Sequence, residues 1–355
     1  MANTILVDIM DKNDFNAGSK ARNDVNVILQ KRGFQPVVIY NRKHGKIGKA
    51  FDLLKAYPRL GSTLEDGSLA VVQYPYGLSV MRRMLARLRK IKERKKIQIV
   101  ILIHDVGFLR DICVSKRDLR GGNLMEQEIA IFNQADIVIS HSVQMSEILK
   151  QKGVRTRLLN LGPFDYLYDG PLAKNAVSGD SFQVVYAGNL AREKSGFLYS
   201  CPKFENVDFH LYGLNSKELP AHFHYKGAFP AEELIENMEG NYGLVWDGES
   251  ASTCAGVAGE YLRYNSPHKC SLYIAAGLPI LIWKKAAAAE YVEKHKIGLC
   301  VDSLYELESL LVSISEQEYL KMRQNVLSVR ENLVTGGQLG TIIEGLQKEC
   351  KEKEF

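Results

Sequence analysis

The sequence lacks the features that would place it in a membrane, a metal-binding class or an oxidising compartment. Its longest apolar runs, 99–103 and 278–283, are far shorter than the roughly 20 residues of a membrane-spanning helix. The six cysteines form no Cys-x-x-Cys pair, which argues against a metal knuckle or redox motif and favours reduced thiols. No basic segment followed by an apolar one opens the chain, so we expect no secretory leader and a cytoplasmic location.

What the sequence does contain is ordinary for a globular protein. Of 355 residues, 46% are hydrophobic and 25% are charged, which excludes disordered, collagen-like and small disulfide-stapled chains. The length predicts two domains of about 150 residues. The net charge of +5 permits an anionic ligand, and no known nucleic-acid-binding module is present. We therefore expect no nucleic-acid partner.

Short apolar segments alternate with helical patterns along nearly the whole chain. This alternation indicates βαβ units and parallel sheets, that is, an α/β fold. Strands are expected at 4–9, 36–40, 69–73, 98–103, 136–140, 184–187, 207–212, 243–246 and 279–282. Turn-forming residues interrupt the pattern and predict a linker over 161–180. We therefore expect Rossmann-like domains over 1–160 and 181–335, followed by a helix over 336–355.

Two polar segments follow expected strands of the first half. Residues 16–20, Asn-Ala-Gly-Ser-Lys, precede a helix whose free N–H groups can receive an anion, although a Ser-capped turn explains them as well. His104 and Asp105 follow the most apolar strand of this half. An Asp beside a His can serve as a catalytic base, and a capping Asp with a structural His is the simpler alternative.

Two segments of the second half also follow expected strands. Gly188 and Asn189 form a tight turn, and cations come soon after it at Arg192 and Lys194. Backbone N–H groups combined with fixed cations suit a diphosphate, whereas solvated basic residues on a loop are the alternative. Tyr212 ends the next strand and precedes a glycine, an arrangement in which the ring can form a wall against a flat base.

The strongest signal is the segment 264–280, in which a polar loop with proline opens a helix of small residues. That helix ends at Gly277 and feeds an apolar strand. Lys269 lies in its first turn, where a cation is unfavourable for the helix dipole. A cation at this position is explained more easily if it pairs with an anion.

The segment 78–96 predicts a basic amphipathic helix. It carries nine Lys or Arg residues against Glu93 as its single acid, together with an apolar stripe. A solvated outer helix is one interpretation. Peripheral contact with an anionic membrane, or with a partner protein, is the other.

The segment 264–280 resembles the nucleotide-binding segment of bacterial GT-B glycosyltransferases. The resemblance lies in Pro267-His268-Lys269, the small-residue helix after it, and Gly-x-Pro-Ile at 277–280. The segments 16–23 and 104–106 match the same group. The sequence resembles glycosyltransferases of accessory-Sec adhesin clusters, which extend the O-glycan of serine-rich repeat proteins. These enzymes are similar in turn to bacterial β-1,6-galactofuranosyltransferases.

The resemblance implies a GT-B fold, with two facing Rossmann-like domains and a cleft between them. The first domain would serve the acceptor, the second would hold a UDP-sugar, and the last helix would cross back to the first. Arg192 and Lys269 would hold the diphosphate, Tyr212 would lie near the uracil, and Asn16 and Gly18 would approach the donor. Gly188 and Asn189 would form the turn beside it.

The implied activity is the second step of protein O-glycosylation. A hexose would pass from a UDP donor to a protein-linked N-acetylglucosamine, and the enzyme would be a homodimer or homotetramer. Ser266 lies three residues before Lys269, at a position where the resemblance implies Asn in some relatives. Because serine is smaller, it leaves room for a 2-acetamido group, so UDP-N-acetylglucosamine joins UDP-glucose as an expected donor.

We expect transfer without a metal or another cofactor. The sequence has no Asp-x-Asp triplet, the usual carboxylate pair that holds a metal against a diphosphate, and cationic side chains can take that place. Asp247, Glu249 and Glu260 follow strands of the second half and are further candidates for the base.

Three other functions stay open. The chain could be a hexosyltransferase of polysaccharide synthesis, a non-catalytic subunit that binds nucleotide sugars, or a non-hydrolysing sugar-nucleotide epimerase. A dehydrogenase is disfavoured because no dinucleotide fingerprint follows the first strand.

Overall fold

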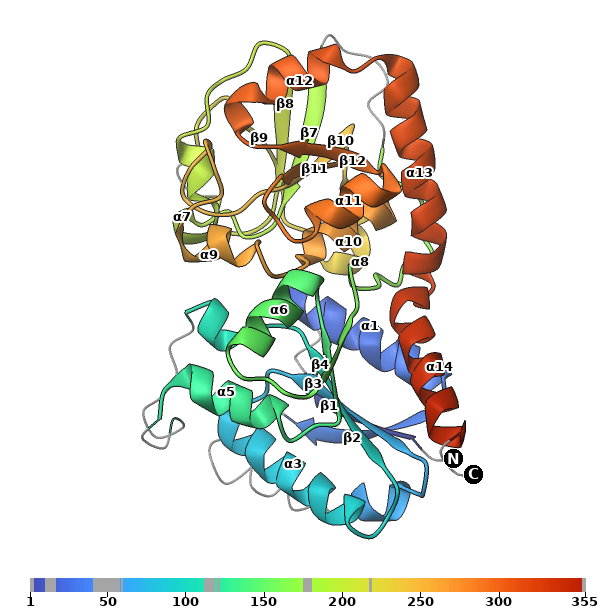
Figure 1. Cartoon of the computed structure of the whole chain (residues 1–355). Coiled ribbons are helices and arrows are strands. Elements are labelled where there is room, and N and C mark those ends of the chain that lie inside the picture. Colours follow the sequence, from blue (N-terminus) through green and yellow to red (C-terminus); the bar gives the residue numbers. More distant parts are fainter. Residues whose placement is uncertain are drawn as a thin grey trace. The chain divides into compact units, whose positions relative to one another are not determined.

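The computed structural model describes residues 3–9, 17–40, 58, 60–111, 119, 122–174, 181–216 and 219–352 (Figure 1). The chain divides into two units. The first comprises residues 1–14, 21–161 and 338–355, and the second comprises 15–20 and 162–337. Each unit contains a six-stranded sheet in which all paired strands run parallel.

The sheet of the first unit has the order β2-β1-β3-β4-β5-β6. Its strands are β1 (Asn3–Ile9), β2 (Phe34–Tyr40), β3 (Leu69–Tyr74), β4 (Gln98–Ile103), β5 (Ile137–Ser140) and β6 (Arg157–Asn160). Its helices are α1 (Ala17–Lys31), α3 (Leu78–Lys92), the 3-10 turn η1 (Gly107–Leu109), α5 (Leu124–Phe132), α6 (Val143–Gln151) and α14 (Gly337–Glu352). Strands β3 and β4 are almost wholly buried, as their continuous apolar sequences require in a parallel sheet.

The sheet of the second unit has the order β12-β11-β10-β7-β8-β9. Its strands are β7 (Phe182–Ala187), β8 (Val207–Tyr212), β9 (His224–Gly227), β10 (Tyr242–Val245), β11 (Ile280–Trp283) and β12 (Gly298–Val301). Its helices are α7 (Arg192–Ser195), η2 (Gly196–Tyr199), α8 (Ala231–Asn237), α9 (Gly256–Tyr261), α10 (His268–Ala276), α11 (Ala289–His295), η3 (Leu304–Glu306), α12 (Leu307–Ser313) and α13 (Glu316–Val334). Trp246 and Trp283 are the largest side chains of its core, and both are fully buried.

Each expected strand matches a strand of the structure, and the α/β prediction with parallel sheets is confirmed. Three strands were not predicted: β6, β9 and β12. All three lie at sheet edges and are partly exposed, so they lack the apolar run of a central strand. The charged stretch after residue 316 forms two helices because Gly336 takes a φ of +86°, which ends α13.

The order of strands in the second unit defines a switch point. From β7 the chain continues to β8 and β9 on one side, and then returns to β10, β11 and β12 on the other side. The loops that leave the carboxyl ends of β7 and β10 therefore run in opposite directions. Open α/β sheets bind their ligands in the crevice between two such loops. No helix among the described residues combines the length and apolar character needed to cross a bilayer.

Candidate functional site

The carboxyl ends of β7 and β10 bring together a set of charged and hydroxyl groups around Asp247. The Lys269 Nζ lies 2.5 Å from Asp247 Oδ1, and the Lys194 Nζ lies 2.8 Å from Oδ2. The hydroxyl of Tyr186, on β7, donates to Oδ1 at 3.2 Å. We call these four residues the Asp247 cluster.

The Asp247 cluster carries more positive than negative charge. Asp247 is 3% exposed, and burial alone would raise its pKa. The ammonium groups of Lys269 and Lys194 outweigh burial, so the pKa of Asp247 lies below its ordinary value and the carboxylate is ionised. Two cations against one anion leave the four residues of the cluster with one unit of net positive charge. The side chain of Lys194 is 35% exposed, so solvent and ligands can reach this charge.

Hydrogen bonds hold the Asp247 cluster in place. The Tyr186 hydroxyl lies 2.6 Å from Ser195 Oγ, which itself donates to the carbonyl of Asn189 at 2.6 Å. Lys269 Nζ donates to the Tyr186 hydroxyl at 3.0 Å. On α10, the Tyr273 hydroxyl accepts the N–H of Ala187, the last residue of β7, at 2.9 Å. The turn after β7 is thus tied both to α7 and to α10.

Two glycines let the strand-end turns meet closely. Gly213 has a φ of +142°, and a Cβ at this position would stand 1.7 Å from the Gly188 carbonyl oxygen. A Cβ on Gly188 would stand 3.0 Å from Lys269 Cε. The glycine at 213 is therefore required by the backbone, and the one at 188 leaves space for the lysine stem.

The residues expected to bind the donor do not all join the Asp247 cluster. Asn189 Oδ1 accepts from the N–H of Ala191 at 3.0 Å and from Asn215 Nδ2 at 2.8 Å, so this side chain shapes its own turn. Arg192 stacks its guanidinium over the Tyr199 ring, 4.3 Å from the centroid. Although Arg192 and Lys194 share helix α7, they are engaged with different neighbours.

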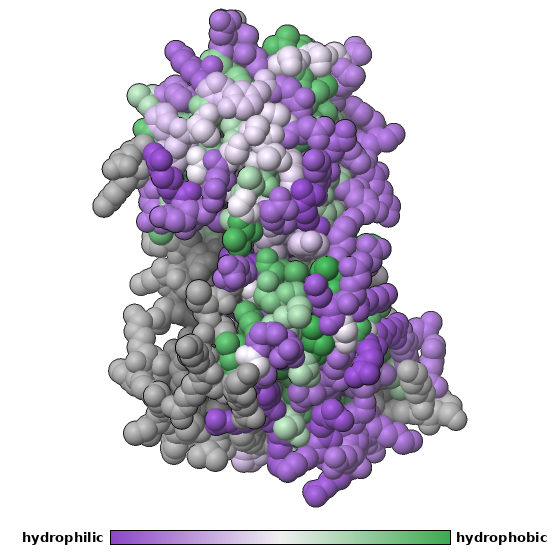
Figure 2. All heavy atoms as spheres, turned by 60° about the vertical axis from the view of Figure 1, so that its left-hand side comes forward, coloured by the Kyte–Doolittle hydropathy of each residue, from purple (hydrophilic) through white to green (hydrophobic). Residues whose placement is uncertain are grey.

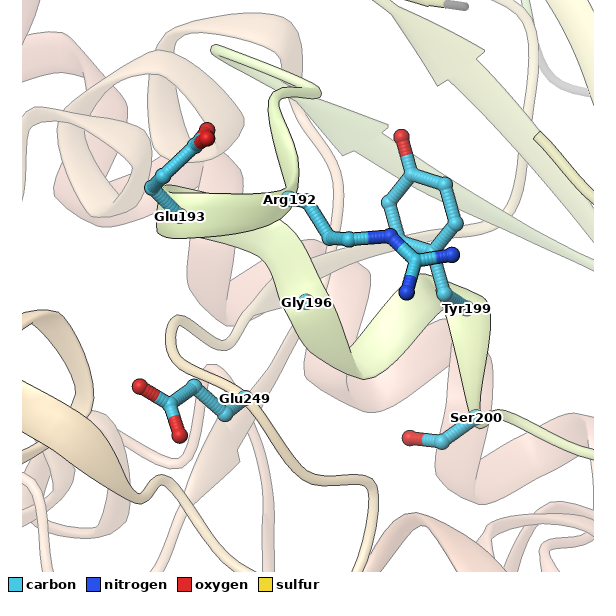
Figure 3. A pocket seen from close by; sticks show the side chains of 6 residues that line it. All are labelled: Arg192, Glu193, Gly196, Tyr199, Ser200 and Glu249. Carbon is cyan, nitrogen blue, oxygen red and sulfur yellow. The ribbon is translucent and has the colours of Figure 1, made fainter. Parts of the chain in front are cut away.

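Arg192 and Tyr199 line a pocket of about 430 Å³, shown in Figure 3. The other lining residues are Glu193, Gly196, Ser200 and Glu249. In Figure 3 the Arg192 side chain lies against the ring of Tyr199, whereas the Glu249 carboxylate extends from the loop after β10. The pocket therefore adjoins the same two strand-end loops as the Asp247 cluster.

Tyr212 was expected to form a wall against a flat base, and its side chain is buried instead. The residue is 1% exposed, and its hydroxyl accepts the N–H of Glu239 at 2.9 Å. Tyr212 ends a central strand, so its side chain packs into the core. Ser266 is also buried, at 5% exposed, just before α10. Gly18 lies in the first turn of α1, and Asn16 lies outside the described residues.

His104 and Asp105 follow β4 and bond to different neighbours. His104 Nε2 lies 2.7 Å from Gln73 Oε1, so this nitrogen carries a proton that it donates. Asp105 pairs with Arg110 at 2.6 Å, and both side chains are about one-third exposed. The two residues thus lie at a strand end, as expected, and their proposed role as the base stays a prediction.

Sequence reasoning missed Glu128, which holds the loop that follows His104. Its buried carboxylate accepts the N–H groups of Gly107 at 2.8 Å and Phe108 at 2.7 Å, and the hydroxyl of Tyr74 at 2.6 Å. Burial raises the pKa of Glu128. Glu128 lies on α5, outside every motif found in the sequence. Its contacts are therefore visible only in the three-dimensional structure.

Asp247 was noted in the sequence only as a candidate base. Its position after an apolar strand was the available signal, but the spacing of 53 and 22 residues to the two lysines gave no sign of pairing. The anion expected for Lys269 is therefore in part the protein's own carboxylate. Among the described residues, no three His, Cys, Asp or Glu side chains stand together as a metal site.

Comparisons with known proteins agree with this fold. Two solved structures share the fold at low identity. Sucrose-phosphate synthase from Thermosynechococcus elongatus has a TM-score of 0.59 at 12% identity, covering 97% of this chain and 99% of that one. A trehalose-6-phosphate structure from Escherichia coli, bound with UDP-2-fluoro glucose, has a TM-score of 0.55 at 9% identity, covering 98% and 99%. The two parallel-sheet units are those of a GT-B glycosyltransferase.

The family follows from sequence. Residues 3–163 match the N-terminal domain model of the glucosyltransferase 3-like family, and residues 184–344 match its C-terminal domain model. The chain belongs to this family. It is 34% identical over 262 residues to the beta-1,6-galactofuranosyltransferase WbbI of Escherichia coli K12, covering 73% of this chain and 74% of that protein. It is 25% identical over 290 residues to glucosyltransferase 3 of Streptococcus parasanguinis, covering 80% of each.

Proposed function

We propose that this glycosyltransferase moves a hexose, glucose or N-acetylglucosamine, from a UDP-sugar to an acceptor that already carries N-acetylglucosamine. The observation that carries the proposal is the net positive Asp247 cluster at the switch point of the second unit. A diphosphate leaving group needs positive charge fixed in advance, and this cluster supplies it at the place where α/β sheets bind ligands. The UDP-2-fluoro glucose bound in a protein of the same fold supports the choice of a UDP-sugar.

In the proposed reaction, the bond between the sugar and the diphosphate breaks, and negative charge builds on the leaving phosphate. Lys269 and Lys194 stabilise this charge, and Asp247 holds both ammonium groups in position. The N-terminus of α10 adds free N–H groups beside Lys269. Burial lowers the pKa of His268 to about 3, so this residue stays neutral and donates or accepts hydrogen bonds without adding charge.

The other expected residues complete the proposal. Arg192, beside its pocket, contacts the outer phosphate or the sugar, and Asn16 and Gly18 approach the donor. The turn at Gly188 and Asn189 brings backbone close to the diphosphate. Base catalysis on the acceptor hydroxyl is assigned to Asp105 with His104.

The proposed acceptor is a serine-rich repeat glycoprotein modified with N-acetylglucosamine, and the step is the second of its O-glycosylation. The similarity to streptococcal glucosyltransferase 3 supports glucose as the transferred sugar, and the acceptor and the step are those that the family resemblance implies. The 34% identity to a beta-1,6-galactofuranosyltransferase favours a second candidate, galactofuranose transfer in polysaccharide synthesis. We also propose that the enzyme is a cytoplasmic homodimer or homotetramer, which light scattering after gel filtration would test.

A donor screen tests the proposed function. The purified protein is incubated with each common UDP-sugar, including UDP-galactofuranose, and with a peptide bearing N-acetylglucosamine. Mass spectrometry then reads the product. A hexose or N-acetylhexosamine increment is expected. UDP binding without an increment would instead indicate a non-catalytic subunit, and an epimerised free UDP-sugar would indicate an epimerase.

The size of residue 266 is expected to select the donor. Ser266→Asn should lower the use of UDP-N-acetylglucosamine relative to UDP-glucose by about 10-fold or more, because a larger side chain crowds the 2-acetamido group. Competition between the two donors in one reaction gives the ratio directly. Ser271→Ala, at a buried position on α10, serves as the control for altered packing. An unchanged ratio in Ser266→Asn would exclude this role.

Metal removal is expected to leave transfer intact. The cations of the Asp247 cluster are proposed to neutralise the diphosphate, which leaves no role for a divalent ion. Initial rates in EDTA should therefore stay within about twofold of the untreated rates. Complete loss of activity in EDTA, with recovery on adding manganese, would contradict this expectation.

A further inference from the structure

Helix α3 and the residues that follow it concentrate the positive charge of the chain. The segment 78–96 carries nine Lys or Arg residues against one Glu, a net charge of +8. The whole chain has a net charge of +5, so everything outside this segment sums to −3. The basic character of the protein therefore belongs to one surface element.

The structure separates this element into two faces. The face toward the core is apolar and consists of Leu78, Met81, Met84, Leu85, Leu88 and Ile91. Three basic side chains at the margins are bonded to the protein: Arg82 to Gln127 at 2.7 Å, Lys92 to Asp136, and Lys95 to the Gly61 carbonyl at 3.1 Å.

The outward face is a stripe of Lys and Arg side chains. Its members recur at intervals of four, three and four residues, which places them on one side of the helix and its extension. They are Arg83, Arg87, Lys90 and Arg94, all exposed, with exposed Arg89 and Lys96 beside them. Within the described part of the chain, their side chains have no ion pair or hydrogen bond. We call these six residues the α3 basic face.

Helix stability alone does not explain the α3 basic face. Cations in the last turn, such as Arg89 and Lys90, offset the negative end of the helix dipole. Arg83 and Arg87 lie in earlier turns, where this effect has faded. A face serving only solubility usually mixes both charge signs, and here Glu93 is the only acid.

We propose that the α3 basic face docks on an anionic phospholipid surface. Its main stripe spans roughly 16 Å of helix, long enough to meet several lipid headgroups at once. Protein interfaces have an apolar or aromatic core, and single-stranded nucleic acid stacks on aromatic rings. None of the large hydrophobic side chains that are exposed among the described residues lies on α3. Hydrophilic residues also predominate along the lower edge of the described surface in Figure 2.

Binding to vesicles tests this proposal without using the transfer reaction. The full-length protein is sedimented with vesicles of phosphatidylglycerol and phosphatidylcholine, and with vesicles of phosphatidylcholine alone. We expect binding only to the anionic vesicles, with a steep decrease between 50 and 300 mM NaCl, roughly as screening predicts. The variant R83Q/R87Q/K90Q/R94Q should bind at least about 100-fold more weakly, since each basic residue contributes roughly fivefold.

The matched control removes the same charge elsewhere. It replaces four exposed lysines with glutamine: Lys152, Lys203, Lys285 and Lys294. This control should bind anionic vesicles within about threefold of the wild type. Equal losses in both variants would show that net charge alone acts, and would overturn the proposal. Tighter binding to single-stranded RNA than to vesicles, at equal phosphate concentration, would also overturn it.

Discussion

Replacing Lys269 with glutamine is expected to lower kcat by about 100- to 1000-fold, the usual effect of losing one group that stabilises a leaving charge. Glutamine keeps a polar side chain, one atom shorter than that of lysine, and removes its positive charge. Asp247 would then be paired with Lys194 alone, and the unit of excess positive charge would disappear from the Asp247 cluster. Because the charge on the diphosphate builds in the transition state, kcat should decrease more than the affinity for UDP.

Steady-state kinetics with the preferred UDP-sugar, together with calorimetric titration of UDP, separates the two effects. Lys284→Gln is the matched control. Lys284 is 60% exposed and pairs with Asp302 at 3.4 Å on the surface, so its kinetics should match the wild type. A kcat for Lys269→Gln within threefold of the wild type would show that the Asp247 cluster is structural only.

Replacing Asp247 with asparagine is expected to destabilise the second unit by about 3–5 kcal/mol, the usual cost of removing one partner of a buried ion pair. The carboxylate is 3% exposed and contacts two ammonium groups, which would then face each other without a counter-charge. Asp302→Asn is the surface control, and its effect should stay below about 1 kcal/mol.

Tryptophan fluorescence during urea denaturation measures this effect selectively. The two tryptophans of the chain, Trp246 and Trp283, both lie in the second unit and are fully buried. The fluorescence change therefore follows the unfolding of that unit. A midpoint for Asp247→Asn equal to that of the wild type would mean that the ion pairs contribute nothing to stability.

The pH dependence of the same measurement has a defined sign. The folded structure lowers the pKa of Asp247, so its stabilisation is complete above the unfolded value of about 3.9 and is lost as the pH falls through the folded value. The difference between the wild type and Asp247→Asn should be constant from about pH 5 to pH 8. It should shrink only below about pH 4, where Asp247 begins to protonate in the unfolded chain while it is still ionised in the folded protein.

The central strands were predictable because burial on both faces demands apolar runs. Strands β4 and β8 begin and end at the predicted residues. The edge strands β6, β9 and β12 were not predictable, because a strand that is partly exposed to solvent tolerates polar residues such as His224 and Lys226. Periodicity thus reveals the centre of a parallel sheet better than its margins.

The candidate site was predictable in location but not in pairing. Gly188 and Lys194 lie beside the end of a strand, where the sequence placed them, and Lys269 lies in the first turn of α10, as expected. That Asp247 joins the two lysines, or that Tyr212 turns into the core, depends on side-chain directions fixed by tertiary packing. A sequence pattern gives the strand end at which a residue lies, but it does not give the partner that the residue meets.

Helix α14 has a consequence for how the polypeptide matures as it is synthesised. The helix belongs to the first unit, where Glu349 forms two hydrogen bonds to Arg157 at 2.6 and 2.9 Å, and where Leu339, Ile343 and Leu346 are buried. When residue 161 has left the ribosome, the apolar surface of the first unit against which α14 packs is still uncovered. The amino-terminal half must therefore wait for the entire second unit to be translated before its own hydrophobic surface is closed. During that interval, the uncovered apolar surface is open to a chaperone or to premature association with another chain.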